Sequence, residues 1–134
     1  MSWFDRYAAA YGSRDPQQIA SWFAEDAVYV GAMGTRFEGA AAIAAYARQF
    51  SDNLSDDFTL ETRTFFEADD RFTAEWTFGG THDRDGMIGP ATGKTFRVEG
   101  ATIGARRNEK IAFARDYWDS AGLMRQLGLL PQRS

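Results

Sequence analysis

DFTLETRTFFEADDRFTAEWTFGGTHD, residues 57–83, decides the fold because apolar and polar residues alternate along most of it. Side chains of a β-strand point to its two faces in turn, so a period of two residues predicts two long strands. The acidic pair Asp69–Asp70 provides the turn between them. Residues 95–119, TFRVEGATIGARRNEKIAFARDYWD, repeat the pattern around Asn108 and Glu109. The second half of the chain therefore predicts long antiparallel strands.

The first half of the chain follows the helical period instead. Trp3, Tyr7 and Tyr11 recur every four residues, which predicts a first helix that ends at Gly12. Asp15 is a good N-cap and a proline follows it, which predicts a second helix. The apolar face of that helix would hold Ile19, Trp22 and Phe23.

Three further stretches complete the expected elements. Residues 27–39, AVYVGAMGTRFEG, predict a strand and a short return strand; residues 39–50, GAAAIAAYARQF, predict a third helix; and residues 120–128, SAGLMRQLG, predict a short last helix. Helices followed by long antiparallel strands indicate one α+β domain over residues 1–134. We expect a strongly curved sheet with helices along one side, forming a cone with an apolar interior.

Composition excludes several classes of function. The net charge is −4 and charges of both signs are interspersed, so no basic surface for nucleic acid is expected. The chain has no cysteine, which excludes disulfides and thiolate chemistry. Its first residues lack the basic start and apolar run of a signal peptide, and no segment approaches the ~20 apolar residues of a membrane span. We expect a soluble, cytoplasmic protein that binds neither nucleic acid nor membrane.

The loop of residues 79–95, GGTHDRDGMIGPATGKT, ends in Gly-Lys-Thr but is not a phosphate-binding loop. Ile88 stands where a Walker A motif needs its first glycine, and the loop joins two strands rather than a strand and a helix. Asp83 and Asp85 resemble part of a calcium loop, but the bidentate glutamate is missing and a lone histidine is a poor zinc site. We expect a solvated turn, with no metal and no cofactor.

The strand before this loop ends in an apolar face, and His82, the only histidine of the chain, lies at the end of that face. Strand alternation groups Phe72, Ala74, Trp76, Phe78, Gly80 and His82 on one side. Two interpretations of His82 stay open: a partly buried side chain bonded to backbone, or a functional group at the edge of a pocket.

Two acids near the end of the last strand need different explanations. Asp119 directly precedes the last helix and is expected to be its N-cap. Asp116 lies mid-strand, on the face of Ala112, Ala114 and Trp118 and opposite the face of Ile111, Phe113, Arg115 and Tyr117. A carboxyl group beside an apolar cavity has a raised pKa and can exchange protons near neutrality. An ion pair or a dimer contact is the alternative role for Asp116.

Six stretches, in chain order, resemble the SnoaL-like polyketide cyclase group of the NTF2-like superfamily: DAVYV, TRFEG, EWTFGGTHDR, IGPATGKTFRVEGATI, KIAFARDYWD and LMRQLGLLP. The resemblance implies a cone-shaped fold, a homodimer and an enzyme without metal or cofactor. It implies that Asp116 is the general acid/base of an intramolecular aldol-type closure or an isomerisation, with His82 as a helper. The substrate would be a small hydrophobic carbonyl compound. Its pocket would be lined by Tyr7, Trp22, Tyr29, Phe50, Trp76, Phe78 and Trp118.

The sequence differs from two related groups at residues that their reactions need, which argues against epoxide hydrolysis and against ketosteroid isomerisation. Limonene-type epoxide hydrolases carry an asparagine and an Arg-x-Asp pair where this chain has Gly31, Trp76 and Phe78. Ketosteroid isomerases place their proton-shuttling aspartate near Gly31, where no acid stands. Two alternatives to an enzyme remain: a non-catalytic domain that binds a small molecule, and a protein-interaction module with an exposed apolar patch.

Overall fold

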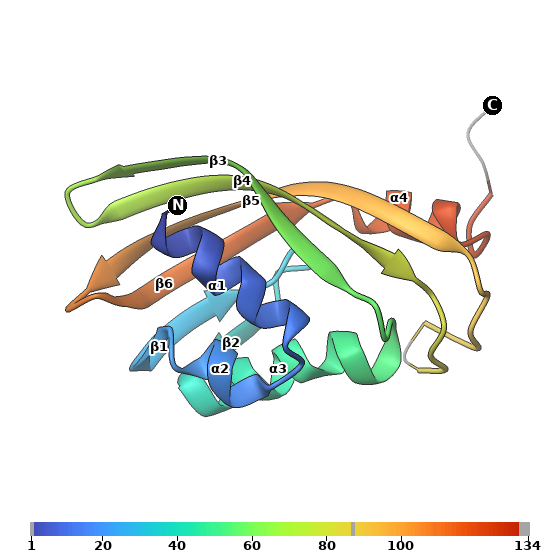
Figure 1. Ribbon diagram of the computed structural model, residues 1–134, viewed down its shortest axis with the longest axis horizontal. Coiled ribbons are helices and arrows are strands. Elements are labelled where there is room, and N and C mark those ends of the chain that lie inside the picture. The colour runs from blue at the N-terminus through green and yellow to red at the C-terminus, as the bar shows by residue number, and fades with distance from the viewer. Residues whose placement is uncertain (1, 87, 132–134) are drawn as a thin grey trace.

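The computed structural model describes residues 2–86 and 88–131, without the side chain of Phe50, and shows an α+β architecture (Figure 1). Six strands form one mixed sheet in the order β2-β1-β6-β5-β4-β3. Strands β1 and β6 run parallel, and the other neighbours run antiparallel. The elements are α1 (Trp3–Gly12), α2 (Pro16–Ala20), β1 (Phe23–Val30), β2 (Arg36–Glu38), α3 (Ala40–Asn53), β3 (Thr59–Ala68), β4 (Arg71–Thr81), β5 (Thr95–Arg107), β6 (Lys110–Trp118) and α4 (Ser120–Gln126).

Helices α1, α2 and α3 lie on the same side of the sheet, while α4 lies near its far end (Figure 1). Helix α1 packs against β3, and α3 packs against β1. The core between helices and sheet is rich in aromatic rings, including Phe4, Tyr7 and Trp76. The expected arrangement of N-terminal helices on a sheet is confirmed, whereas the cone-like curvature of that sheet stays a prediction.

Side-chain caps begin three of the helices. Ser2 and Asp5 form a reciprocal capping box at α1. Asp15 accepts a hydrogen bond from the backbone N–H of Gln17 at α2, and Asp119 accepts one from Gly122 at α4. The predicted N-cap roles of Asp15 and Asp119 are therefore confirmed.

The second helix is shorter than its sequence pattern indicated. It ends at Ala20, so the prediction that Trp22 and Phe23 belong to its apolar face is wrong. Phe23 instead begins β1 and pairs with Ile111 of β6, whose backbone N–H donates to the carbonyl of Trp22 at 2.8 Å. Pairing with β6 gives the backbone at Trp22 and Phe23 the hydrogen bonds that another helical turn would have given it. The two aromatic side chains also favour a strand over a helix.

The long strands follow the predicted alternation. Strands β3 and β4 meet at Asp69–Asp70, and β5 and β6 meet at Asn108–Glu109. Asn108 and Glu109 both have positive φ, at 52° and 65°, as a two-residue hairpin turn requires. The predicted inner face of β4 is buried at Phe72, Ala74, Trp76 and Phe78, and His82, directly after the strand, is buried as well.

Strand β6 departs from strict alternation through a β-bulge. Ala105 pairs with Phe113 and Arg106 pairs with Ile111, so Ala112 has no partner on β5. The expected separation of Ile111 from the Asp116 face is therefore wrong. Ile111 is buried on the core side together with Ala114. The extra residue in the bulge shifts the alternation by one position, so the residues before it point to the opposite face from the one that strict alternation predicts.

No helix among residues 2–86 and 88–131 is both long enough and apolar enough to cross a membrane.

Candidate functional site

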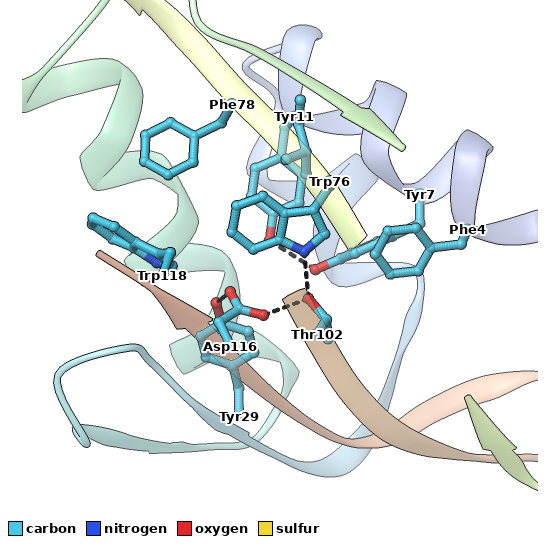
Figure 2. A pocket seen from close by; sticks show the side chains of 10 residues that line it. Phe4, Tyr7, Tyr11, Tyr29, Trp76, Phe78, Thr102, Asp116 and Trp118 are labelled. Atoms are coloured by element: carbon cyan, nitrogen blue, oxygen red, sulfur yellow. Dashed lines mark hydrogen bonds between the residues drawn. The ribbon is translucent and has the colours of Figure 1, made fainter. Parts of the chain in front are cut away.

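Three strands bring a hydrogen-bonded group of side chains around Asp116 (Figure 2). Asp116 on β6 pairs directly with Thr102 on β5, whose hydroxyl donates to Asp116 Oδ1 at 2.6 Å. The hydroxyl of Tyr29 on β1 donates to the other carboxylate oxygen, Oδ2. Each oxygen of Asp116 therefore accepts one hydrogen bond and keeps lone-pair capacity for another group.

Trp76 extends this group into the core. Its indole Nε1–H donates to Thr102 Oγ1 at 2.8 Å, and both side chains are buried. The ring of Trp76 reaches this position because Gly100, its partner on β5, has no side chain. A Cβ atom on Gly100 would lie 2.5 Å from Trp76 Cη2.

Helix α1 adds two tyrosine hydroxyls to the same space. Tyr7 and Tyr11 lie one helical turn apart, and their hydroxyl oxygens are 2.7 Å apart. This single hydrogen bond uses one of the two hydroxyl protons. Since the other proton has no acceptor among the residues that the structure describes, one O–H of the pair can serve a bound group.

Burial raises the pKa of the Asp116 carboxyl from 3.8 to about 6, and the hydrogen bonds from Thr102 and Tyr29 limit the rise. Burial also raises the pKa of the nearby tyrosines, that of Tyr46 to about 12 and those of Tyr7, Tyr11 and Tyr29 further. Asp116 is thus the acid in this group whose protonation changes near neutral pH, as a general acid/base requires.

The space at Asp116 is small, and a larger one adjoins it. Asp116 lines a cavity of about 30 Å³, room for one or two water molecules. Its other lining residues are Phe4, Tyr7, Tyr11, Tyr29, Leu60, Trp76, Phe78, Thr102 and Trp118. Next to it lies an apolar chamber of about 590 Å³. Trp118 lines both spaces, and its ring packs edge-to-face against Phe78 at 5.0 Å between centroids. Trp118 therefore lies where the small cavity at Asp116 and the chamber adjoin.

The chamber is suited to a neutral, apolar molecule. Helix α3, the β1–β2 connection and helix α4 line it, with Phe37, Leu54, Ile88, Leu123 and Met124 among the apolar side chains. Its polar side chains include Gln49, Asn53 and Tyr46, and no Asp, Glu, Lys or Arg is among its described lining residues. Its volume falls within the usual range for small-molecule sites.

Most of the predicted site residues meet at this place. Asp116, Tyr7, Tyr29, Trp76, Phe78 and Trp118 all line the small cavity. Trp22 is not among the lining residues and stacks on Trp3 instead, 6.5 Å between centroids. Phe50 lies outside the residues whose side chains the structure describes.

His82 lies directly after β4 and lines neither space. Its Nδ1 accepts a hydrogen bond from the backbone N–H of Thr92 at 3.2 Å, so its proton is on Nε2. Nε2 is buried and makes no hydrogen bond within the part of the chain that the structure describes. This geometry matches the structural interpretation of His82, which closes the loop between β4 and β5.

Sequence reasoning missed Thr102, Tyr11, and the adjoining chamber. A two-residue turn at Asn108–Glu109 without a bulge would pair Asp116 with Ala101. The bulge at Ala112 moves the pairing by one residue to Thr102. Nothing in the sequence marks that bulge. Tyr11 could have been found, because it lies four residues after Tyr7 on the same helical face.

The described residues contain no group of three His, Cys, Asp or Glu side chains placed to hold a metal ion. The site consists of one carboxyl group, hydroxyl donors and aromatic walls. Such a set can bind a carbonyl compound and move a proton.

Solved structures share the fold over nearly the whole chain. TsrD from Streptomyces laurentii is 24% identical, with a TM-score of 0.82 and coverage of 95% of this chain and 92% of that one. A protein of ketosteroid isomerase-like fold from Catenulispora acidiphila, in complex with trimethylamine, is 25% identical, with a TM-score of 0.80 and coverage of 92% and 90%. A candidate polyketide cyclase from Xanthomonas campestris is 22% identical, with a TM-score of 0.74 and coverage of 90% of each chain.

No curated protein matches the chain in sequence. The family model for SnoaL-like polyketide cyclases matches residues 3–127, which include every element from α1 to α4. The chain therefore belongs to the SnoaL-like polyketide cyclase family, with the NTF2/ketosteroid isomerase-like fold.

Proposed function

We propose that this protein is a cofactor-independent acid/base enzyme that closes a ring in a neutral, apolar carbonyl compound by an intramolecular aldol-type reaction. The observation that carries the proposal is the carboxyl group of Asp116, which has a pKa of about 6 and lies beside an apolar chamber. A base with a pKa near the working pH is deprotonated often enough to act and strong enough to accept a proton.

Asp116 takes a proton from a carbon next to a carbonyl group of the substrate. The electron pair of that C–H bond forms an enolate, and the enolate carbon then attacks a second carbonyl carbon of the same molecule. A C–C bond forms, and the second carbonyl oxygen becomes an alkoxide. Asp116 returns its proton to that alkoxide, so the product is an isomer of the substrate and the carboxylate is regenerated.

Hydroxyl groups supply hydrogen bonds to the negative oxygen that develops. The Tyr7–Tyr11 pair has one hydroxyl proton left for this purpose, and it borders the same small cavity as Asp116. A preorganised donor in a water-excluded site stabilises such a charge, and removing one typically costs about 10²–10³ in rate. We assign this role to Tyr7 and Tyr11 rather than to His82.

The bulk of the substrate occupies the chamber, and its reacting carbon reaches Asp116 past Trp118. The cavity of about 30 Å³ is too small for a ring, so the indole of Trp118 has to rotate for the reacting part to enter. Side-chain rotation at a partly exposed position is fast compared with typical turnover.

Proton abstraction can be tested without the natural substrate. 2-Tetralone is a neutral, two-ring ketone with acidic protons next to its carbonyl, and their exchange in D₂O is followed by proton NMR. We expect the protein to accelerate exchange and Asp116→Asn to lose at least about 100-fold of that acceleration. Asp119→Asn is the matched control, since it removes an acid three residues away that caps α4. Equal exchange by the wild type and Asp116→Asn contradicts the proposal.

A non-catalytic binding domain is the second candidate, favoured by the small size of the cavity at Asp116. In that case ligands stay in the chamber and never reach the carboxyl group. Tight binding of 2-tetralone without any acceleration of exchange supports this candidate over the enzyme.

A further inference from the structure

We propose that Thr102 and Trp76 are positioning residues that orient Asp116 through a one-way chain of hydrogen bonds from indole to hydroxyl to carboxylate. The proposal deepens the proposed function, because it concerns how the reacting carboxylate is held. Asp116 itself touches the substrate; Thr102 and Trp76 act through it.

The chemistry of the donors fixes the direction of the chain. An indole N–H can only donate, so Thr102 Oγ1 must accept from Trp76, at 2.8 Å. With that lone pair occupied, the hydroxyl proton of Thr102 turns to Asp116 Oδ1, 2.6 Å away. A hydroxyl without such a partner could rotate to another acceptor. Trp76 therefore holds the Thr102 proton on the carboxylate.

The backbone keeps the chain in place. Thr102 and Asp116 are direct partners across β5 and β6, and Trp76 and Gly100 are direct partners across β4 and β5. The indole lies over Gly100, where a side chain would collide with it. Trp76 and Thr102 are each only 4% exposed, so bulk solvent does not compete for their hydrogen bonds.

The chain limits the effect of burial on Asp116. Burial disfavours the carboxylate, while the Thr102 and Tyr29 donors favour it. The other titratable side chains that face Asp116 are Tyr29 from β1, Tyr7 and Tyr11 from α1, and Tyr46 from α3. All four stay protonated across the range in which Asp116 titrates, so a change at Thr102 is read directly in the titration of Asp116.

The test is a carbon-13 NMR titration of the Asp116 carboxyl in the full chain, assigned by its loss in Asp116→Asn. Thr102→Val keeps the shape of the side chain but removes the donor, so we expect the midpoint to rise by about one pH unit or more. Thr102→Ser keeps the hydroxyl and should restore a midpoint close to that of the wild type. Trp76→Phe removes the N–H together with one ring of the indole but keeps an aromatic side chain, and it should raise the midpoint by a smaller amount.

A wild-type midpoint in Thr102→Val overturns the proposal, and a wild-type midpoint in Trp76→Phe overturns the part that concerns Trp76. Amide spectra that match the wild type show that each variant is folded. The titration needs no substrate. A shifted midpoint together with no acceleration of 2-tetralone exchange by the wild type would therefore support this chain and contradict the proposed function.

Discussion

The burial of Asp116 should appear as a pH-dependent effect of Asp116→Asn on stability. The carboxyl has a pKa of about 6 in the folded protein, against 3.8 for an ordinary aspartate. Since the folded pKa is raised, the protonated carboxyl is favoured by folding. Its contribution is fully present below about pH 4 and is lost as the pH rises through about 6. Asparagine has no such titration.

The size of the effect follows from the difference between the two pKa values. Each unit of difference between the folded and unfolded pKa corresponds to about 1.4 kcal/mol. The difference of about two units therefore changes the free energy of unfolding by at most roughly 3 kcal/mol. Asp116 is partly exposed as a residue, and water that reaches the carboxylate lowers this figure. Asparagine also has one acceptor oxygen for two donors, Thr102 and Tyr29. That mismatch has a cost that does not vary with pH in this range.

The assay is urea unfolding of the wild type and Asp116→Asn at several pH values between 4 and 8. The change with pH of the stability difference isolates Asp116, because other carboxyl groups such as Asp5 and Asp57, whose pKa values are lowered, are common to both proteins. Between pH 4 and pH 7, we expect the free energy of unfolding of Asp116→Asn to increase by roughly 1–3 kcal/mol relative to that of the wild type. A stability difference that stays constant over this range refutes the burial of an ionisable Asp116.

Three further substitutions test other parts of the structure. Gly100→Ala places a methyl group against Trp76 and Trp118 and should cost about 1–3 kcal/mol in urea unfolding; a loss below about 0.5 kcal/mol would contradict the close packing. Asp119→Ala removes the N-cap of α4 and should cost about 1 kcal/mol, with faster amide exchange at Gly122; unchanged exchange there would count against the cap. His82→Ala should speed amide exchange at Thr92 but keep 2-tetralone exchange within about threefold of the wild type. A loss of 100-fold or more would instead place His82 in the chemistry.

Much of the fold could be predicted from periodicity, because long strands and amphipathic helices carry strong patterns. Both hairpin turns, the caps at Asp15 and Asp119 and the inner face of β4 were predicted correctly. The end of α2 was not, since the pairing of Phe23 with β6 depends on a strand nearly ninety residues away in the sequence.

The candidate site was predictable only in part. Asp116, Tyr7, Tyr29 and Trp76 could be named because their residue types stand out on a strand or helix face. Thr102 could not, because its place opposite Asp116 depends on a bulge that no residue type announces. His82 stood out as the only histidine, but its position at the strand end gave no information about its distance from Asp116.

The proposed chemistry requires that the Asp116 carboxyl group is held among aromatic side chains and titrates near neutral pH. Carbon-13 NMR of the Asp116 side chain in the wild-type protein measures that property without a substrate or a second variant in the titration. We expect a midpoint of about 6. A midpoint at or below 3.8, the value of an ordinary aspartate, would mean that burial does not disfavour the carboxylate and would contradict a role for Asp116 as an acid/base near neutral pH.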